Sequence, residues 1–419
     1  MRFAARPWTA AAWAVAFALA APASAVATAE SCGDPEAAEY ATHECKVERL
    51  RARSFAVVAV VDSGINPYHV DFRLAGDDDL VGVHPSEYIE GYPAGAHTLR
   101  LSFDAVAVGE ARARDVEQWA QAGPGELSWV DGTNIVGGVS VDPSVDFFDT
   151  GGHGTGVASQ AAGRVLGPNH PDVLLVAVKS GDAGVEWASR QPWIDAISMS
   201  WSRLVPLGFT AASTWSAADA GKVVCAATGN LTVPLWFFQE QGPSWHVNVG
   251  AVHAADRTEP TYTGFPADVL GVTAVPAASH TSMTESRQFS GTSGATPAVC
   301  GLIAQTVADA RRRLGDTREG SRGDGVLAVG PALAGPAGDG ALTRAEVEDA
   351  VMATAVPTTS APPADFVRGG YGIVDRDSVA DALAVLVGER ARPDRPVEDL
   401  WLDATDAARD AVWGAPPPD

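Results

Sequence analysis

Continuous apolar runs rich in β-branched residues constrain the fold of this chain more than any other feature. The runs are FAVVAVV at 55–61, VLLVAVK at 173–179, IDAISMSW at 194–201, KVVCAATGN at 222–230 and HVNVGAV at 246–252. Runs without polar alternation are typical of strands that are buried on both faces of a parallel sheet. Helical patterns such as GTGVASQAAG (154–163) and FTAASTWSAADAG (209–221) lie between them.

Strands that alternate with helices predict an α/β fold, a three-layer sandwich with a mostly parallel central sheet between helices. A length of 419 residues accommodates one large domain of this class with extensions at both ends. Chemistry in such sheets collects at the carboxyl ends of the strands. We therefore expect the functional side chains in the turns that follow the apolar runs.

The N-terminus, MRFAARPWTAAAWAVAFALAAPASAVA, predicts export. Two arginines precede an apolar run over 8–21, and the small residues of 23–25 match a signal-peptidase site. A membrane anchor is the alternative, but the run is shorter than the roughly 20 residues of a spanning helix. We expect residues 1–25 to be a cleaved signal peptide and the mature protein to be secreted.

The formal net charge of −23 bears on the partners of the protein. An acidic surface is repelled by nucleic acid and by anionic membranes, so we expect neither as a partner.

The four cysteines fall into two groups. Cys32 and Cys45 flank a short polar segment, and in an exported protein that spacing predicts a local disulfide. Cys225 lies in an apolar run and Cys300 in a helical pattern. A bridge between these two is an alternative, but buried free thiols are common, and we favour two free thiols that serve structural packing.

The segment FSGTSGATPAVCG, residues 289–301, places a bare serine at the start of a helix. The apolar spacing predicts a helix from Pro297 to the arginines of 311–313, with Gly315 as its stop. Ser293 could cap this helix, since serine is preferred at helix N-termini. It could also be a nucleophile, because the free N–H groups of a helix start stabilise an oxyanion. The second interpretation requires a base and an acid elsewhere.

Three further residues are candidates for that chemistry. His153 lies in DTGGHGTGVAS at a glycine-rich helix start; a solvated loop histidine is the alternative. A dinucleotide-binding loop is disfavoured, because Val157 or Ser159, depending on register, stands where a glycine is needed. Asp62 and Asn230 end apolar runs, and each alone could be a turn residue. The sequence has no His-Glu-x-x-His or Cys-x-x-Cys motif for catalytic zinc.

Taken together, four stretches resemble the subtilisin-like serine peptidases, the subtilases. They are VVDSGI with Asp62, GHGTGVA with His153, AATGN with Asn230 and SGTSGATPAVCG with Ser293. The order acid, histidine, serine is that of this family and differs from the chymotrypsin and α/β-hydrolase orders. ISMSW (197–201), VNVGAV (247–252) and GYGIVD (370–375) add to a resemblance that runs from about 55 to about 385.

The resemblance implies a secreted serine endopeptidase and a role for each residue. Ser293 attacks the scissile carbonyl, and His153 takes its proton and later gives it to the leaving amine. Asp62 orients the imidazole, and the Asn230 side chain binds the oxyanion together with the Ser293 N–H. A catalytically inactive subtilisin fold kept for binding is the alternative, and the presence of all four residues argues against it.

The resemblance also implies a substrate-binding set and a set of partners. The groove strand, which pairs with substrate main chain, comprises Ser200, Trp201 and Ser202. One wall of the primary specificity pocket comprises Ala227, Thr228 and Gly229. The implied partners are protein or peptide substrates, without nucleic acid or membrane, and the protein is expected to be a monomer.

Several positions depart from the family pattern. Gly156 stands where many relatives have a second histidine, and Ser202 replaces a glycine of the groove strand. About 30 residues separate the signal peptide from the first strand, too few for the usual folded pro-domain. Asp71 matches a calcium carboxylate of the family, but the helix after His153 lacks the bulge with the partner ligands. We expect no metal and no cofactor, with calcium left open.

The expected organisation has four parts. Residues 1–25 are the signal peptide, 26–49 an N-terminal extension, 50–388 the peptidase domain and 389–419 a C-terminal tail. The domain contains an insertion over about 85–140 near the site and a Gly/Pro-rich surface loop over 315–341. Thr343 and Glu346 predict a capping box at the start of a helix that follows this loop.

Overall fold

The computed structural model describes residues 32–394 except 38, 143–144, 202–208, 232–245, 265–266, 315–325, 330–340 and 359–368. The predicted signal peptide, Ser202 and nearly all of the C-terminal tail lie outside the described residues.

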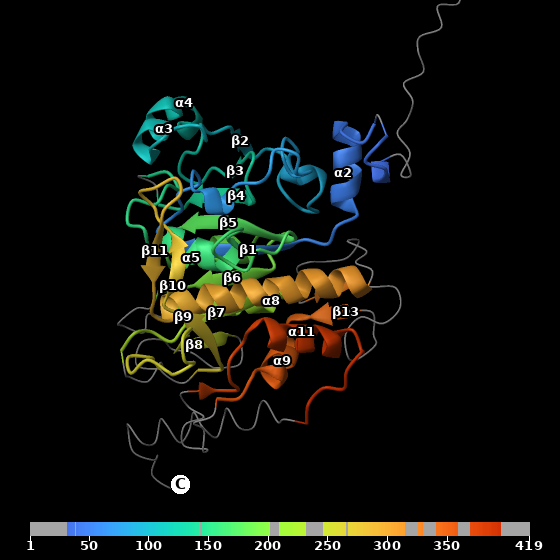
Figure 1. Ribbon diagram of the computed structural model, residues 1–419, viewed down its shortest axis with the longest axis vertical. Coiled ribbons are helices and arrows are strands. Elements are labelled where there is room, and N and C mark those ends of the chain that lie inside the picture. Colours follow the sequence, from blue (N-terminus) through green and yellow to red (C-terminus); the bar gives the residue numbers. More distant parts are fainter. Residues whose placement is uncertain are drawn as a thin grey trace, which may run out of the picture.

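A nine-stranded sheet in the order β2-β3-β4-β5-β1-β6-β7-β8-β9 forms the centre of the molecule (Figure 1). Its strands are β1 (Ala56–Asp62), β2 (His97–Leu99), β3 (Ser128–Val130), β4 (Ile135–Ser140), β5 (Val173–Lys179), β6 (Ala196–Met199), β7 (Val223–Ala227), β8 (Val247–His253) and β9 (Val269–Thr273). All neighbouring strands are parallel except β3 and β4. The five predicted apolar runs form β1, β5, β6, β7 and β8.

Helices cover both faces of this sheet. Figure 1 views the face that carries α5 (His153–Ala162) and α8 (Thr292–Leu314), with α9 (Arg344–Thr354) and α11 (Arg376–Leu386) packed against α8. The core of the other face includes residues of α2 (His43–Arg51), α6 (Asp182–Ser189) and α7 (Phe209–Asp219).

Strand β1 shows why its sequence carries no polar alternation. Ala56, Val58 and Val60 belong to the core under α5 and α8, and the residues between them belong to the opposite core. Each fully buried valine contributes about 1.5–3 kcal/mol relative to its exposed state. The predicted three-layer α/β sandwich is therefore confirmed.

Helix α8 begins earlier than the sequence pattern predicted. It starts at Thr292 and contains Pro297, where a start at Pro297 was expected. Proline lacks the N–H that would bond the carbonyl of residue 293, four positions earlier. That carbonyl instead accepts a hydrogen bond from the Ser200 hydroxyl at 3.1 Å. A contact from outside the helix thus replaces the missing bond and lets the helix continue past the proline.

The Gly/Pro-rich segment 315–341 contains regular structure, which corrects the prediction of a loop throughout. Strand β12 (Val326–Val329) pairs antiparallel with β13 (Ala341–Thr343), and the rest of the segment lies outside the described residues. The predicted capping box at α9 is confirmed. Thr343 Oγ1 accepts from the Glu346 N–H at 3.3 Å, and the Glu346 carboxylate accepts from the Thr343 N–H at 2.8 Å.

The segment 85–140 extends the sheet beyond β4. It contains β2, α3 (Val108–Arg114), α4 (Val116–Trp119), β3 and β4. Trp119 donates from Nε1 to the Tyr68 hydroxyl at 2.7 Å, and Tyr68 donates to Asp115 at 2.9 Å. The Trp119 ring lies 5.0 Å from that of Phe147, in the segment that leads to α5. This part of the chain therefore buttresses the approach to His153.

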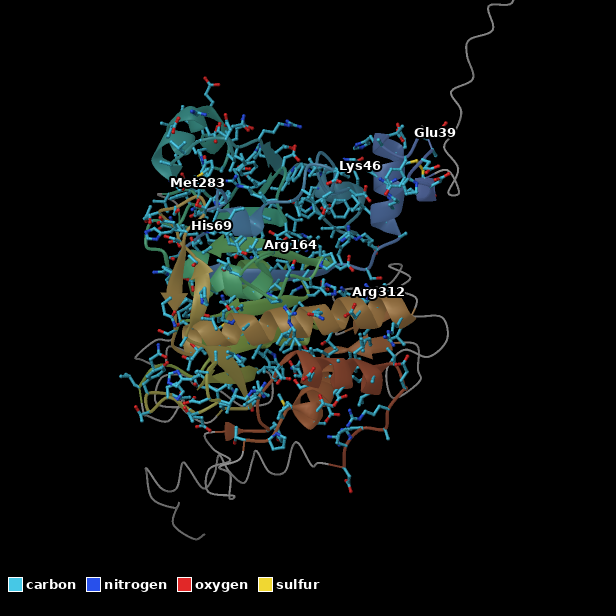
Figure 2. All side chains as sticks on the ribbon, viewed as in Figure 1. Glu39, Lys46, His69, Arg164, Met283 and Arg312 are labelled. Carbon is cyan, nitrogen blue, oxygen red and sulfur yellow. A yellow bond between two sulfur atoms is a disulfide. The ribbon has the colours of Figure 1, made fainter. Side chains whose placement is uncertain are left out.

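The N-terminal extension is tied to the domain through α2. The predicted Cys32–Cys45 disulfide is present, and Cys225 and Cys300 are buried free thiols, as favoured. Arg49 donates to Asp79 at 2.9 Å and Lys46 to the Val81 carbonyl at 3.1 Å. In Figure 2, Glu39 and Lys46 lie far across the molecule from His69 and Met283. Among the described residues, no helix combines the length and apolar character needed to cross a bilayer.

Candidate active site

Two sequence-distant residues, Asp62 and His153, meet at the carboxyl edge of the sheet. Asp62 is the last residue of β1, and His153 is the first residue of α5. His153 Nδ1 lies 2.9 Å from Asp62 Oδ1 and 3.0 Å from Oδ2. The Asp62 side chain is 5% exposed and that of His153 is 43% exposed. The hydrogen bond to Asp62 raises the pKa of His153, and burial opposes the rise.

Glycines allow the turn after β1 to approach the start of α5. A Cβ on Gly154 would lie 2.2 Å from the Gly64 carbonyl oxygen, so a side chain there would separate the two segments. Gly152 has a φ of 85°, in the left-handed region that favours glycine. The glycine-rich GGHG sequence therefore reflects the close approach that the Asp62–His153 contact requires.

Phe289 explains why the chain has a glycine where many relatives have a second histidine. Its ring centroid lies 5.5 Å from that of His153 in an edge-on arrangement. A Cβ on Gly156 would lie 2.8 Å from the Phe289 ring. The aromatic ring thus occupies the space above Gly156 and packs on the catalytic candidate itself.

Ser293 is the second residue of α8, and its polar atoms bond to Ser200. The Ser293 hydroxyl donates to the Ser200 carbonyl oxygen at 3.1 Å, and the Ser200 hydroxyl donates to the Ser293 carbonyl at 3.1 Å. Within the described residues, no hydrogen bond joins Ser293 to His153. The Ser293 hydroxyl does not accept from the N–H groups of its own helix, which removes the capping interpretation.

Asn230 lies beside the turn that enters α8. Its Oδ1 accepts from the Thr292 N–H at 2.9 Å and from the Thr292 hydroxyl at 3.1 Å. A Cβ on Gly291 would lie 2.8 Å from Asn230 Nδ2, and Gly291 has a φ of 85°. With Oδ1 engaged by Thr292, the amide orientation is fixed and Nδ2 is the group left to donate.

A cleft of about 350 Å³ runs beside His153. Its lining residues come from the ends of several strands: Asp62, Ser63, Asp142, His153, Lys179, Ser180 and Trp201. The Trp201 indole donates to the Val61 carbonyl at 2.9 Å, which fixes the ring along the cleft. Of the predicted groove strand, Ser200 and Trp201 therefore lie at the site, and Ser202 is outside the described residues.

The predicted pocket wall lies at the end of β7. Ala227 and Thr228 are buried, and the Gly229 carbonyl accepts from the Gly264 N–H at 3.0 Å. A Cβ on Gly264 would lie 2.0 Å from the Thr228 carbonyl oxygen. The wall is thus backed closely by a second segment, which makes it rigid.

Asp71 does not fit the role of a calcium ligand. Its carboxylate is fully buried and accepts from the Ser159 hydroxyl at 2.6 Å. The N–H groups of Val165 and Leu166 donate to it at 2.7 and 2.8 Å. These donors present positive partial charge, which opposes a cation at the same oxygens. Among the described residues, no cluster of His, Cys, Asp or Glu has the arrangement of a metal site.

Asp149 is a buried carboxylate at this site that the sequence analysis missed. It lies in the turn before α5 and accepts hydrogen bonds from both the β1 turn and the helix start. A signal existed, because an aspartate shortly before a glycine-rich helix start is a typical capping residue.

Comparison with known proteins identifies the fold and the enzyme class. The sequence profile of the Peptidase S8 subtilase family matches residues 54–372, which is more than half of the chain. The chain belongs to the subtilase family. This subtilase is thus a serine peptidase that acts on proteins or peptides, as predicted. A search of curated proteins found no match.

Solved structures similar to this subtilase include two proteases. One is the prenylagaramide maturation protease PagA, with 18% identity, coverage of 82% of this chain and 99% of that chain, and a TM-score of 0.47. The other is a cold-adapted subtilisin-like serine proteinase, with 17% identity, coverage of 77% and 88%, and a TM-score of 0.43.

Proposed function

We propose that this subtilase is a secreted serine endopeptidase with Ser293 as nucleophile, His153 as base and Asp62 as the orienting acid. The contact of His153 Nδ1 with both oxygens of buried Asp62 carries the proposal. Donation from Nδ1 leaves Nε2 as the proton acceptor. The Asp62 carboxylate also stabilises the imidazolium that forms when His153 takes the proton. The raised pKa of His153 agrees with this.

In the proposed reaction, the Ser293 hydroxyl turns from the Ser200 carbonyl toward His153. Loss of its proton to Nε2 accompanies attack on the scissile carbonyl carbon and gives a tetrahedral oxyanion. Asn230 Nδ2 and the Ser293 N–H donate to that oxyanion. His153 then protonates the leaving amine, and water hydrolyses the acyl-enzyme by the same steps. These residues need no cofactor for the reaction.

The proposed substrate is an extended segment of a protein or peptide. It pairs with the groove strand, residues 200–202, as an added strand, and its side chain before the cleaved bond faces Ala227, Thr228 and Gly229. The acidic charge of −23 supports the expectation that nucleic acid and membranes are not partners, and we propose a monomer. The predicted signal peptide and the Cys32–Cys45 disulfide support secretion.

A fluorophosphonate probe tests this function against the inactive binding fold. We expect the wild-type protein to be labelled and to hydrolyse casein, and Ser293→Ala to do neither while keeping its circular dichroism spectrum. Ser86→Ala, a serine of the 85–87 turn, is the control and should behave as wild type. Labelling of the Ser293 variant, or no labelling of the folded wild-type protein, would refute the mechanism.

A further inference from the structure

We propose that Asp149 is a positioning residue whose carboxylate holds Asp62 and His153 in register. The inference rests on the proposed function, because it concerns the same pair. Asp149 is fully buried in the turn that leads to α5. It is absent from the proposed chemistry, yet it bonds to the segments that carry both members of the pair.

One oxygen of Asp149 spans the two segments. Oδ1 accepts from the Ser63 hydroxyl at 2.9 Å, and Ser63 directly follows Asp62. The same oxygen accepts from the N–H groups of Gly151 and Gly152 at 2.9 and 2.7 Å. Gly152 directly precedes His153, so a single atom contacts the chain neighbour of each catalytic candidate.

The second oxygen fixes the first turn of α5. Oδ2 accepts from the Thr155 N–H at 2.8 Å and from its hydroxyl at 2.7 Å. Ser63 closes the arrangement, because its hydroxyl oxygen accepts from the Gly154 N–H at 2.9 Å. Donors occupy both oxygens, and an asparagine offers only one acceptor oxygen. Substitution by asparagine therefore places an N–H₂ group against one set of donors.

The charge of Asp149 also acts on His153. Among the described residues, the charges that act on the pKa of this histidine are those of Asp62 from β1, Arg287 from β11 (Ser286–Phe289) and Asp149 from the preceding turn. Asp142 and Lys179 line the same cleft, and His280 lies against Gly152. Asp62 is the main cause of the raised pKa of His153; the negative charge of Asp149 adds to it and Arg287 opposes it. Loss of the Asp149 charge therefore lowers the pKa of His153, which a purely structural defect does not require.

The test compares three variants on an uncharged peptide substrate, between about pH 5 and 9. We expect Asp149→Asn to lower kcat about tenfold or more with little change in KM. The acid limb of kcat/KM should move to lower pH, because the lost negative charge no longer raises the pKa of His153. Ser63→Ala removes the hydrogen bond between Ser63 and Asp149 but keeps the negative charge of Asp149. In this variant kcat should therefore fall without a shift of the acid limb. Asp146→Asn, a carboxylate of the same segment that pairs with Arg112, should change neither.

Wild-type kcat and an unshifted acid limb in Asp149→Asn would overturn the proposal, as would equal effects in Asp146→Asn. If Asp149→Asn does not fold, Ser63→Ala is the deciding variant. A lower kcat at wild-type KM supports a positioning role for the Ser63–Asp149 hydrogen bond, and a wild-type kcat overturns it. The proton on His153 Nδ1, followed by NMR, gives a readout that needs no turnover. Its resonance should weaken or exchange faster in Asp149→Asn, and an unchanged resonance contradicts the proposal even if the wild-type protein fails to react with fluorophosphonate.

Discussion

The Asn230 side-chain amide is held through its oxygen, Oδ1, and this leaves its nitrogen, Nδ2, as the group that can donate. Oδ1 receives two hydrogen bonds from Thr292, the residue before Ser293. The two groups of the proposed oxyanion hole, Asn230 Nδ2 and the Ser293 N–H, are therefore linked through Thr292. Preorganised donors of this kind need no reorientation when charge develops on the substrate oxygen.

Replacing Asn230 by alanine should slow the chemical step selectively. We expect kcat to fall by about 10²–10³, a range known from a subtilisin, while KM changes little. Thr292→Ser keeps the hydroxyl and the N–H and serves as the control, with near-normal kcat. Steady-state kinetics on a peptide substrate separates the two constants, and a kcat close to wild type in Asn230→Ala would remove this residue from the mechanism.

Glu348 of α9 gives the folded state a pH dependence unrelated to catalysis. Burial raises its pKa to about 7, and the partner Arg344 opposes the rise. The folded state thus binds this proton more tightly than the unfolded state does. The stabilisation is complete below the ordinary glutamate pKa and is lost as pH rises to about 7.

Glu348→Gln should remove that part of the pH dependence. The free energy of unfolding, measured with urea, should fall less between about pH 5 and 7.5 in the variant than in the wild-type protein. Asp349→Asn, next along α9 and 40% exposed, is the matched control and should keep the wild-type slope. Equal slopes in the wild-type protein and Glu348→Gln would show that this carboxyl titrates normally.

At the scale of residues, short sequence motifs identified the candidate catalytic residues, but they did not predict which distant residues would contact them. Asp62, His153, Asn230 and Ser293 each lie in a short stretch whose small neighbours indicate close backbone approach. Their partners come from elsewhere in the chain: Phe289 against His153, and Ser63 against Asp149. Such pairings depend on how strands and helices are ordered in space, which residue spacing does not contain.

Helix α8 carries the proposed nucleophile on a turn with one backbone hydrogen bond missing. Pro297 leaves the Ser293 carbonyl free, and the Ser200 hydroxyl donates to it. In Pro297→Ala, the new N–H competes for this carbonyl, which loosens the contact between the helix start and the end of β6. We expect kcat to fall about tenfold through the displaced Ser293, with Tm equal to or above that of the wild-type protein.

Calorimetry and steady-state kinetics check both halves of that prediction. Ala298→Ser, on the next helical position, is the control for substitution within this turn. A lower Tm together with unchanged kcat would mean that the proline supports the helix rather than the position of Ser293.

At the scale of elements, five buried strands were predictable, whereas β4, β9 and the strands of three residues were not. The five apolar runs form the inner strands because burial on both faces selects an unbroken apolar sequence. By contrast, β2, β3 and β13 have three residues each, too few to show any period. Their pairing is set by tertiary contacts, and β12 in the glycine-rich segment was missed for the same reason.

At the scale of the whole molecule, α2 of the N-terminal extension lies on the opposite side of the molecule from β11 (Figure 1). Helix α2 leads directly into the amino end of β1, whereas Asp62 ends that strand. The described part of the extension therefore braces the domain without lining the cleft. Its contacts join α2 to the segment around Asp79 and Val81.

Removing the disulfide should loosen this brace and leave the site intact. In Cys32→Ser/Cys45→Ser we expect faster cleavage before β1 by an added protease, unchanged kcat and KM, and a loss of at most about 3 kcal/mol in stability. Arg49→Gln, which breaks the pair with Asp79 but keeps the disulfide, should give a smaller increase in cleavage. A large fall in kcat would show that the extension shapes the active site.

The two edges of the central sheet bear on whether this protein associates with other chains. The border strand β2 has only three residues, and at the other border Ile373 bridges to Leu270 of β9. Short or bridged borders offer little template for another chain to join. A peptidase that receives unfolded chains as added strands is exposed to partners that could polymerise on it. In the described part of this sheet, the borders therefore disfavour self-association, which leaves the proposed substrate groove as the place for strand addition.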